Sequence, residues 1–144
     1  MTEGPKDWRC EGVRIVRATA LQEALGPSGL GRATVYDFAT SGGATWIGSV
    51  VLPPMAVTGM HHHGHHEIAL LVAAGRSEIR WGERLEFGAE IGPGDWAYFP
   101  PQVPHQERNV SDSETVHFIV VRNASERIAV PLPGEVADEP EIVA

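Results

Sequence analysis

The 144-residue sequence contains a single cysteine, Cys10. A lone thiol cannot close a disulfide within the chain, so a cross-linked secreted scaffold is excluded and a reducing compartment is favoured. Long apolar runs are also missing, because no stretch approaches the ~20 residues of a transmembrane helix. The first residues, Met1 to Lys6, lack the apolar core of a signal peptide. We therefore expect a cytoplasmic protein with no membrane partner.

Positive charge is scarce in this sequence. Lysine and arginine together number 11 against 19 aspartate and glutamate residues, which gives a formal net charge of -8. Proteins that bind nucleic acid through its phosphates need a basic patch or stripe. We therefore expect no nucleic-acid partner.

Helical patterning is nearly absent as well. Only Ala18 to Leu25, ended by Gly26 and Pro27, reads as a helix, whereas the 16 glycines and 11 prolines are typical of short strands joined by tight turns. This pattern predicts an all-β sandwich or barrel. The expected strands cover residues 13–17, 33–38, 45–52, 67–74, 77–81, 85–87, 95–99, 105–110 and 115–122.

The length suits one domain with a sizeable core. We expect a barrel with an N-terminal strand arm over residues 1–123, followed by a tail over residues 124–144. The tail is rich in proline and acidic residues, so we expect it to lie along the surface or to be partly disordered.

Histidine is concentrated in one place. Five of the seven histidines fall within residues 61–66, where the run is interrupted by Gly64 and leads into an apolar segment. Crowded imidazoles repel one another when they are protonated, whereas a divalent cation holds them neutral and coordinated. An affinity tag or a solvated loop is the alternative, but tags are terminal and usually uninterrupted. The cluster therefore predicts a metal site.

Strand parity selects among these histidines. Residues two apart on a strand lie on the same face. His61 and His63 are therefore expected to point toward one site, and His62 is expected to lie on the opposite face. Gly64 permits the chain to turn and return with a third ligand, which is either His66 or Glu67. His66 would complete nitrogen-rich coordination and Glu67 mixed coordination. We predict His66 and keep Glu67 as the alternative.

The second half of the chain supplies a further histidine within a spaced motif. Gly94, Pro100, His105 and Asn109 have the spacing of the second motif of the cupin superfamily, although Gln102 stands where that family usually has glycine. The first cupin motif is similar to His61-x-His63 with Glu67 following, but Gly75 comes one position late. If Gly75 is taken as the anchor, the family's glutamate position falls on Ile68. This departure is a reason to retain His66.

The resemblance to cupins implies a double-stranded β-helix, or jelly-roll barrel, in which His105 joins the first-motif histidines as a metal ligand. Pro100, Pro101 and Pro104 form a stiff turn that would fix the aim of His105. The His61 to Glu67 segment, the chain length and the turn at 81–84 resemble a group of small single-domain bacterial cupins that includes polyketide cyclases. That resemblance implies a homodimer with a histidine-rich zinc site beneath an apolar cavity. Residues Val13 to Arg17, which alternate and need a partner edge, are expected at the dimer interface.

The expected ligands, His61, His63, His66 and His105, add no charge to the ion. The ion would therefore keep its full double charge and act as a strong Lewis acid. Imidazole suits zinc, iron, nickel and copper, and a carboxylate ligand shifts the preference toward iron or manganese. We expect one divalent transition-metal ion per chain, zinc first, with iron, nickel or manganese as alternatives.

No side-chain nucleophile is evident, because Cys10 lies far from the histidines in sequence and no Ser-His-Asp pattern is visible. We expect a metal-dependent cyclase that closes aromatic rings of a poly-β-keto chain by aldol-type chemistry. A dioxygenase that cleaves an enolised substrate is the alternative enzyme, and a non-catalytic module that binds a metal or small ligand is the alternative of another class. Glu67, if it is not a ligand, and His117, if it faces inward, are the candidate catalytic residues for moving a proton. Ile119 and Val121 alternate with His117, and both faces of that strand are apolar, so the facing of His117 stays open.

Overall fold

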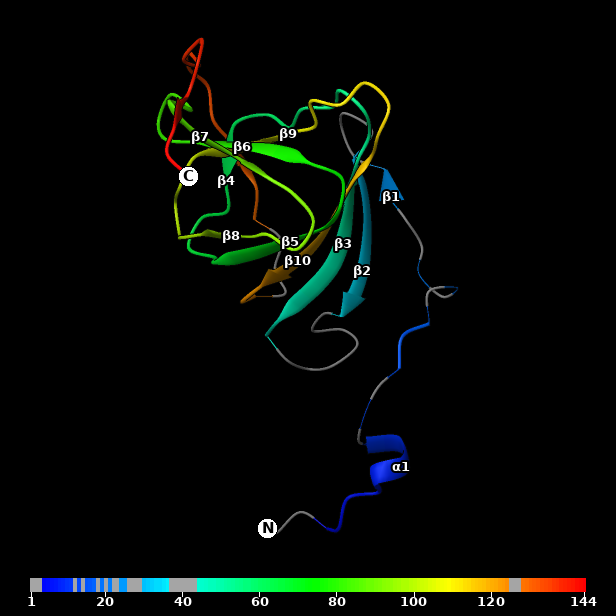
Figure 1. Ribbon diagram of the computed structural model, residues 1–144. Helices are drawn as coiled ribbons and strands as arrows, with labels where there is room; N and C mark the ends of the chain where they lie inside the picture. The colour runs from blue at the N-terminus through cyan, green and yellow to red at the C-terminus, as the bar shows by residue number, and fades with distance from the viewer. Residues whose placement is uncertain are drawn as a thin grey trace.

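The computed structural model describes residues 4–11, 13, 15–17, 19, 21, 24–25, 30–36, 44–124 and 128–144. Two six-stranded sheets pack against each other, with strand orders β1-β2-β3-β10-β5-β8 and β11-β4-β9-β6-β7-β12 (Figure 1). The all-β jelly-roll fold predicted from the sequence is confirmed. The elements are α1 (Trp8–Glu11), β1 (Ala24–Leu25), β2 (Gly31–Tyr36), β3 (Trp46–Leu52), β4 (His61–His62), β5 (Ile68–Ala74), β6 (Ser77–Trp81), β7 (Phe87–Ile91), β8 (Trp96–Phe99), β9 (His105–Arg108), β10 (Val116–Arg122), β11 (Val130–Pro131) and β12 (Glu141–Ile142).

The core lies between the two sheets and is built from one face of each central strand. Alternate residues of β3 are buried along its whole length, and β5 alternates over its first five residues. Phe118 of β10 pairs with Val50 on one side and with Val72 on the other, and all three are nearly inaccessible to solvent. Burying such apolar side chains is the main favourable term in folding. The strand pattern therefore fixes which face of this sheet borders the barrel interior.

The N-terminal expectations are only partly met. The predicted helix over 18–25 lies mostly outside the described residues, and its end, Ala24–Leu25, is strand β1, because antiparallel pairing with β2 overrides the weak local helix signal. The predicted strand over 13–17 is wrong for the residues described, since Val13, Ile15 and Val16 have no regular structure and are exposed. The short α1 turn, which was not predicted, lies away from the barrel (Figure 1). None of the helices in the described part of the chain has the length and apolar character needed to cross a membrane.

The C-terminal tail is built into the second sheet. β11 pairs antiparallel with β4, and β12 pairs parallel with β7, so these two strands form the outer edges of that sheet. The buried guanidinium of Arg80 fixes the intervening segment, because it donates hydrogen bonds to the carbonyls of Leu85 and Ala137. Through the pairing of β11, the tail contacts β4, the strand that contains His61 and His62.

Candidate metal centre

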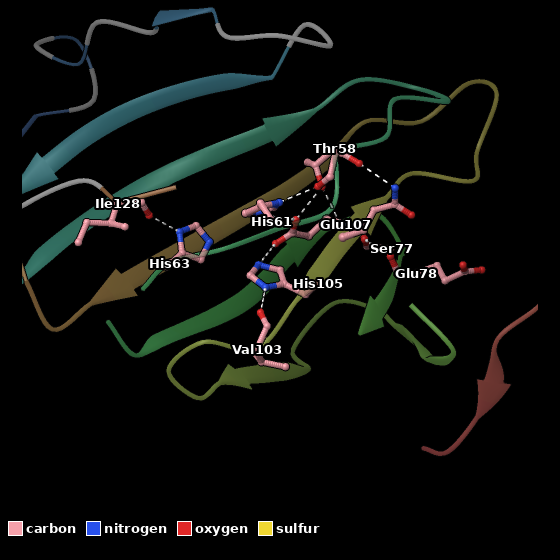
Figure 2. A network of polar contacts seen from close by, with 11 residues as sticks. Thr58, His61, His63, Ser77, Glu78, Val103, His105, Glu107 and Ile128 are labelled. Carbon is pink, nitrogen blue, oxygen red and sulfur yellow. Dashed lines mark hydrogen bonds and ion pairs between the residues drawn. The ribbon is translucent and has the colours of Figure 1, made fainter. Parts of the chain in front are cut away.

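Three histidines converge on one point: one lies on β4, one follows directly after β4, and one lies on β9 (Figure 2). His61 of β4 is the register partner of His105 of β9, so their side chains project from the same face of the sheet. His63 follows directly after β4, and its ring centre lies 4.9 Å from that of His61. The ligand atoms of these three residues all lie within 4.8 Å of one another. The structure therefore brings together three of the four predicted ligands, which we call the histidine triad.

Backbone carbonyls fix the orientation of every ring in the triad. Nδ1 of His61 lies 2.7 Å from the carbonyl oxygen of Gly59, Nδ1 of His63 lies 2.8 Å from that of Ile128, and Nδ1 of His105 lies 3.0 Å from that of Val103 (Figure 2). A carbonyl only accepts hydrogen bonds, so each Nδ1 carries the proton. Each Nε2 is then left with a lone pair for a metal ion, an arrangement typical of histidine ligands.

A carboxylate that the sequence analysis missed completes the surroundings of the triad. Glu107 follows His105 by two residues on β9, and strand parity could have identified it. Its Oε1 lies 3.5 Å from Nε2 of His105, and its Oε2 lies 4.0 Å from Nε2 of His61. The hydroxyl of Thr58 donates a 3.0 Å hydrogen bond to Oε2 and accepts one from the backbone N–H of Glu107. Glu107 is therefore held with its carboxylate toward the triad.

The electrostatics follow from burial and from this carboxylate. Burial lowers the pKa of His61 and lowers that of His63 to about 4. Burial also opposes protonation of His105, but the negative charge of Glu107, the direct contact with its carboxylate and the hydrogen bond to the Val103 carbonyl together outweigh burial, so the pKa of His105 is raised. Burial favours the neutral form of Glu107, yet interactions with His105, His61 and Thr58 lower its pKa to about 2. At neutral pH the carboxylate is charged, and His61 and His63 are neutral.

The donor set fits a divalent transition metal. Nε2 of His105 is buried and makes no hydrogen bond, which is costly for a polar atom unless another partner binds there. Three imidazole nitrogens with an adjacent carboxylate match the protein ligands that zinc, iron and manganese take in enzymes. We therefore regard His61, His63 and His105 as the residues that would hold such an ion.

The fourth predicted ligand, His66, is not part of the triad. It is 2 % exposed, its ring packs against His65, and its backbone N–H closes a turn onto the carbonyl of His63. His66 is therefore buried two residues before β5, and it does not belong to the group of ligand atoms formed by the other three histidines. His62 also points elsewhere, as parity predicts, and its Nδ1 accepts a hydrogen bond from the N–H of Gly64.

The two proposed proton-moving residues lie on the surface. Glu67 is exposed and accepts hydrogen bonds from the hydroxyl of Tyr98 at 2.6 Å and from the amide of Asn123 at 3.3 Å. His117 is exposed because its neighbours Val116 and Phe118 take the buried face of β10. Neither residue lines the cavity beside the triad. The only carboxylate that lines it, within the described ranges, is Glu107.

A cavity of about 390 Å³ adjoins the triad inside the barrel. The indole of Trp46 lines this cavity. It packs against Gly48, where the Cβ atom of any other residue would clash with it. The volume lies within the roughly 300–1,000 Å³ of small-molecule pockets. Its lining is mainly apolar: Leu30, Trp46, Val50, Met60, Ile68, Leu70, Phe118, Val120, Ala129 and Pro131 accompany the polar or charged Arg32, Thr58, His61, His63, Glu107 and Arg122.

The loops that frame the site contact each other directly. The backbone N–H of Gln102 donates a 2.8 Å hydrogen bond to the carbonyl of Gly64, which ties the segment before β9 to the turn after His63. Gln102 has a positive φ of 67°, a conformation that glycine adopts without steric cost. This explains why glycine is usual at the matching position of the cupin motif.

Comparisons with known proteins agree with this architecture. RemF, a polyketide cyclase from Streptomyces resistomycificus, is 18% identical with a TM-score of 0.73, and the alignment covers 89% of each chain. Rru_A2000, a cupin-2 domain protein from Rhodospirillum rubrum, is also 18% identical, with a TM-score of 0.70 over 85% of this chain and 81% of that one. An oxalate decarboxylase from Lactobacillus farciminis is 15% identical, with a TM-score of 0.68 over 79% of this chain and 34% of that one.

A comparison with curated proteins found no match. The family model described as Cupin domain matches residues 48–122, which is just over half of the chain and contains the whole histidine triad. With the jelly-roll fold, this match establishes that the chain belongs to the cupin family.

Proposed function

We propose that this cupin is a metal-dependent enzyme that closes rings in a poly-β-keto substrate by aldol-type chemistry. The observation that carries the proposal is the histidine triad, whose three Nε2 atoms are prepared for a metal ion at the wall of a mainly apolar cavity. RemF supports the reaction type, because it is a polyketide cyclase with the same fold over 89% of both chains.

In this proposal each group has a separate task. The triad holds a divalent ion, zinc first, which when bound supplies Lewis-acid polarisation of a carbonyl. The apolar walls exclude water, which strengthens electrostatic interactions inside the cavity. Glu107 is charged at neutral pH and receives the proton from the carbon between two carbonyl groups. Thr58 keeps the carboxylate in position through its 3.0 Å hydrogen bond. That carbon then bonds to a second carbonyl carbon of the same chain, which closes the ring, and the oxygen of that carbonyl takes the proton back from Glu107. The hydroxyl group so formed leaves as water together with the remaining hydrogen of the attacking carbon, which gives a carbon–carbon double bond.

The test is turnover of a synthetic poly-β-keto substrate by zinc-loaded protein under strict anaerobiosis. We expect cyclised product from the native protein and a loss of at least 10²-fold in kcat for Glu107→Gln, the lower end of the usual general-base contribution. Glu90→Gln is the matched control, because Glu90 forms an exposed ion pair with Arg76 and neither residue lines the cavity. Tight metal binding without turnover of any substrate would favour the non-catalytic binding module instead.

One observation favours a second candidate, an oxygen-dependent cleavage of an enolised substrate. Glu107 offers a carboxylate 3.5 Å and 4.0 Å from two of the imidazole nitrogens, and a carboxylate in the donor set shifts the metal preference toward iron or manganese. Product that appears only with oxygen, and only with iron, nickel or manganese bound, would replace the cyclase with a dioxygenase.

A further inference from the structure

The three rings of the triad differ in which part of the chain orients them. His61 and His105 are each oriented by a carbonyl that lies two residues earlier in the chain. His63 is oriented by the carbonyl of Ile128, which lies 65 residues further along the chain (Figure 2). The orientation of His63 therefore depends on the C-terminal tail, whereas the hydrogen bonds that orient the other two rings are local.

The tail meets this part of the barrel through residues 128–132, which we call the tail strap. The strap contains β11, which pairs with β4 and forms an outer edge of the second sheet. The backbone N–H of Leu132 adds a 2.9 Å hydrogen bond to the carbonyl of Met60, the residue before β4. Together with the hydrogen bond between Ile128 and His63, these contacts hold the strap beside the segment that contains two of the three ligands.

The tail strap also forms part of the cavity wall. Ala129 and Pro131 line the cavity, and Val130 between them is 37 % exposed. Ala129 and Pro131 are exposed as well, so at this place a single strand separates the cavity from solvent. A short edge strand with exposed side chains buries little apolar surface, and segments of this kind open at a lower free energy than core strands. The strap is therefore suited to act as a lid.

Metal binding and the position of the strap affect each other through His63. Coordination at Nε2 of His63 requires the proton to be on Nδ1, where the carbonyl of Ile128 holds it. When the strap leaves, the ring loses this acceptor and is free to rotate or to take the other tautomer, and both changes lower its affinity for an ion. Coordination at Nε2 in turn makes the Nδ1–H group a stronger donor to the strap. Such coupling is reciprocal, so each event favours the other by the same factor.

We propose that the tail strap is a lid over the metal centre, which metal binding closes and which opens more often in the metal-free protein. Opening uncovers the cavity on the side of Ala129 and Pro131 and releases His63, so this side is the entrance for the ion and for a ligand. The inference rests on metal binding by the triad, which is part of the proposed function, and it does not depend on the cyclase reaction.

The test is amide hydrogen exchange of the full chain, followed by NMR with and without saturating zinc. The reporting amide is that of Leu132, which closes the strap onto β4. The control is the amide of Val143, which donates to the carbonyl of Gly88 beside β12, the opposite outer strand of the same sheet. We expect zinc to slow exchange at Leu132 by about fivefold or more, the factor that corresponds to one ordinary hydrogen bond, and to leave Val143 nearly unchanged. No slowing at Leu132, or equal slowing at both amides, would overturn the proposal.

Variants test the coupling in the reverse direction. Leu132→Pro removes the N–H donor that fastens the strap and keeps all three ligands, and Val143→Pro removes the corresponding donor beside β12. We expect Leu132→Pro to raise the zinc Kd by about five- to tenfold, less than the roughly 10- to 100-fold that follows complete loss of a ligand's hydrogen-bond partner. Val143→Pro should keep the native Kd. Competition with a chromophoric chelator measures the Kd, and circular dichroism checks folding. A folded Leu132→Pro variant with the native Kd would contradict the coupling.

The outcomes separate this inference from the proposed function. Zinc binding without slower exchange at Leu132 would reject the lid and leave the cyclase in place. Slower exchange at Leu132 without turnover of any poly-β-keto substrate would keep the lid and reject the cyclase. Native protein that binds none of zinc, iron, nickel and manganese would overturn both.

Discussion

Replacement of His105 is the sharpest test of the metal centre. His105 is 1 % exposed, its Nδ1 is held by the carbonyl of Val103, and its Nε2 is a buried nitrogen without a hydrogen bond that faces the rest of the triad and Glu107. His105→Gln keeps most of the side-chain volume beside Phe99, whose ring centre is 4.3 Å away, and removes the imidazole donor. We expect the variant to fold and to bind metal weakly.

The magnitude follows from the number of ligands. A complete structural zinc site contributes roughly 10–16 kcal/mol, or about 2.5–4 kcal/mol for each of its four ligands. Because about 1.4 kcal/mol corresponds to a tenfold change in affinity, loss of one imidazole from the triad should raise the zinc Kd by about 10²- to 10³-fold. No compensation is expected from the Nδ1 hydrogen bonds, since these only orient the remaining rings.

The assay is competition with a chromophoric chelator on untagged protein, together with metal analysis and circular dichroism. His62→Gln is the matched control, because His62 belongs to the same histidine run but its Nδ1 accepts a hydrogen bond from the N–H of Gly64. His66→Gln separates three-histidine from four-histidine coordination, and we expect it to keep the metal. Retention of the native Kd within threefold by His105→Gln, or an equal loss in His62→Gln, would refute the proposed ligand set.

Three further predictions concern stability and assembly. In metal-free protein, burial lowers the pKa of His63 to about 4. In the unfolded chain the pKa of histidine is ~6.5, so below pH 6.5 the unfolded chain binds more protons than the folded one. The free energy of unfolding should therefore fall by up to about 3 kcal/mol as the pH drops from 6.5 to 4. Urea denaturation of native and His63→Gln protein at several pH values measures this, and an equally steep fall in the variant would contradict it. Phe118→Ala should cost about 3–5 kcal/mol in urea denaturation, because Phe118 is 1 % exposed in the core, whereas Ile119→Ala on the outer face of the same strand should cost less than about 1 kcal/mol; similar losses would show that the core is placed wrongly. We also propose that a homodimer covers the exposed Val13 and Ile15, so light scattering should report twice the 15.6 kDa of one chain, and a native monomer at micromolar concentration would disprove this.

The local sequence pattern predicted much of the site. The period-two rule placed His61 and His63 on one face and turned His62 away, because alternation along a strand is a property of the backbone itself. The same rule, applied to β9, would have identified Glu107 beside His105. The spacing of Gly94, Pro100, His105 and Asn109 resembles the second cupin motif, and that resemblance implied the correct fold.

The sequence by itself determined the all-β class and three of the histidines that converge. Only the tertiary structure decided that His66 stays outside the triad, that the carbonyl of Ile128 orients His63, and that Arg32 and Arg122 face the cavity. The physical reason is the distance along the chain over which each interaction acts. Strand parity acts between neighbours along the chain, whereas pairing of β4 with both β9 and β11 joins segments more than 40 residues apart, and the register of those pairs follows from packing of the whole barrel.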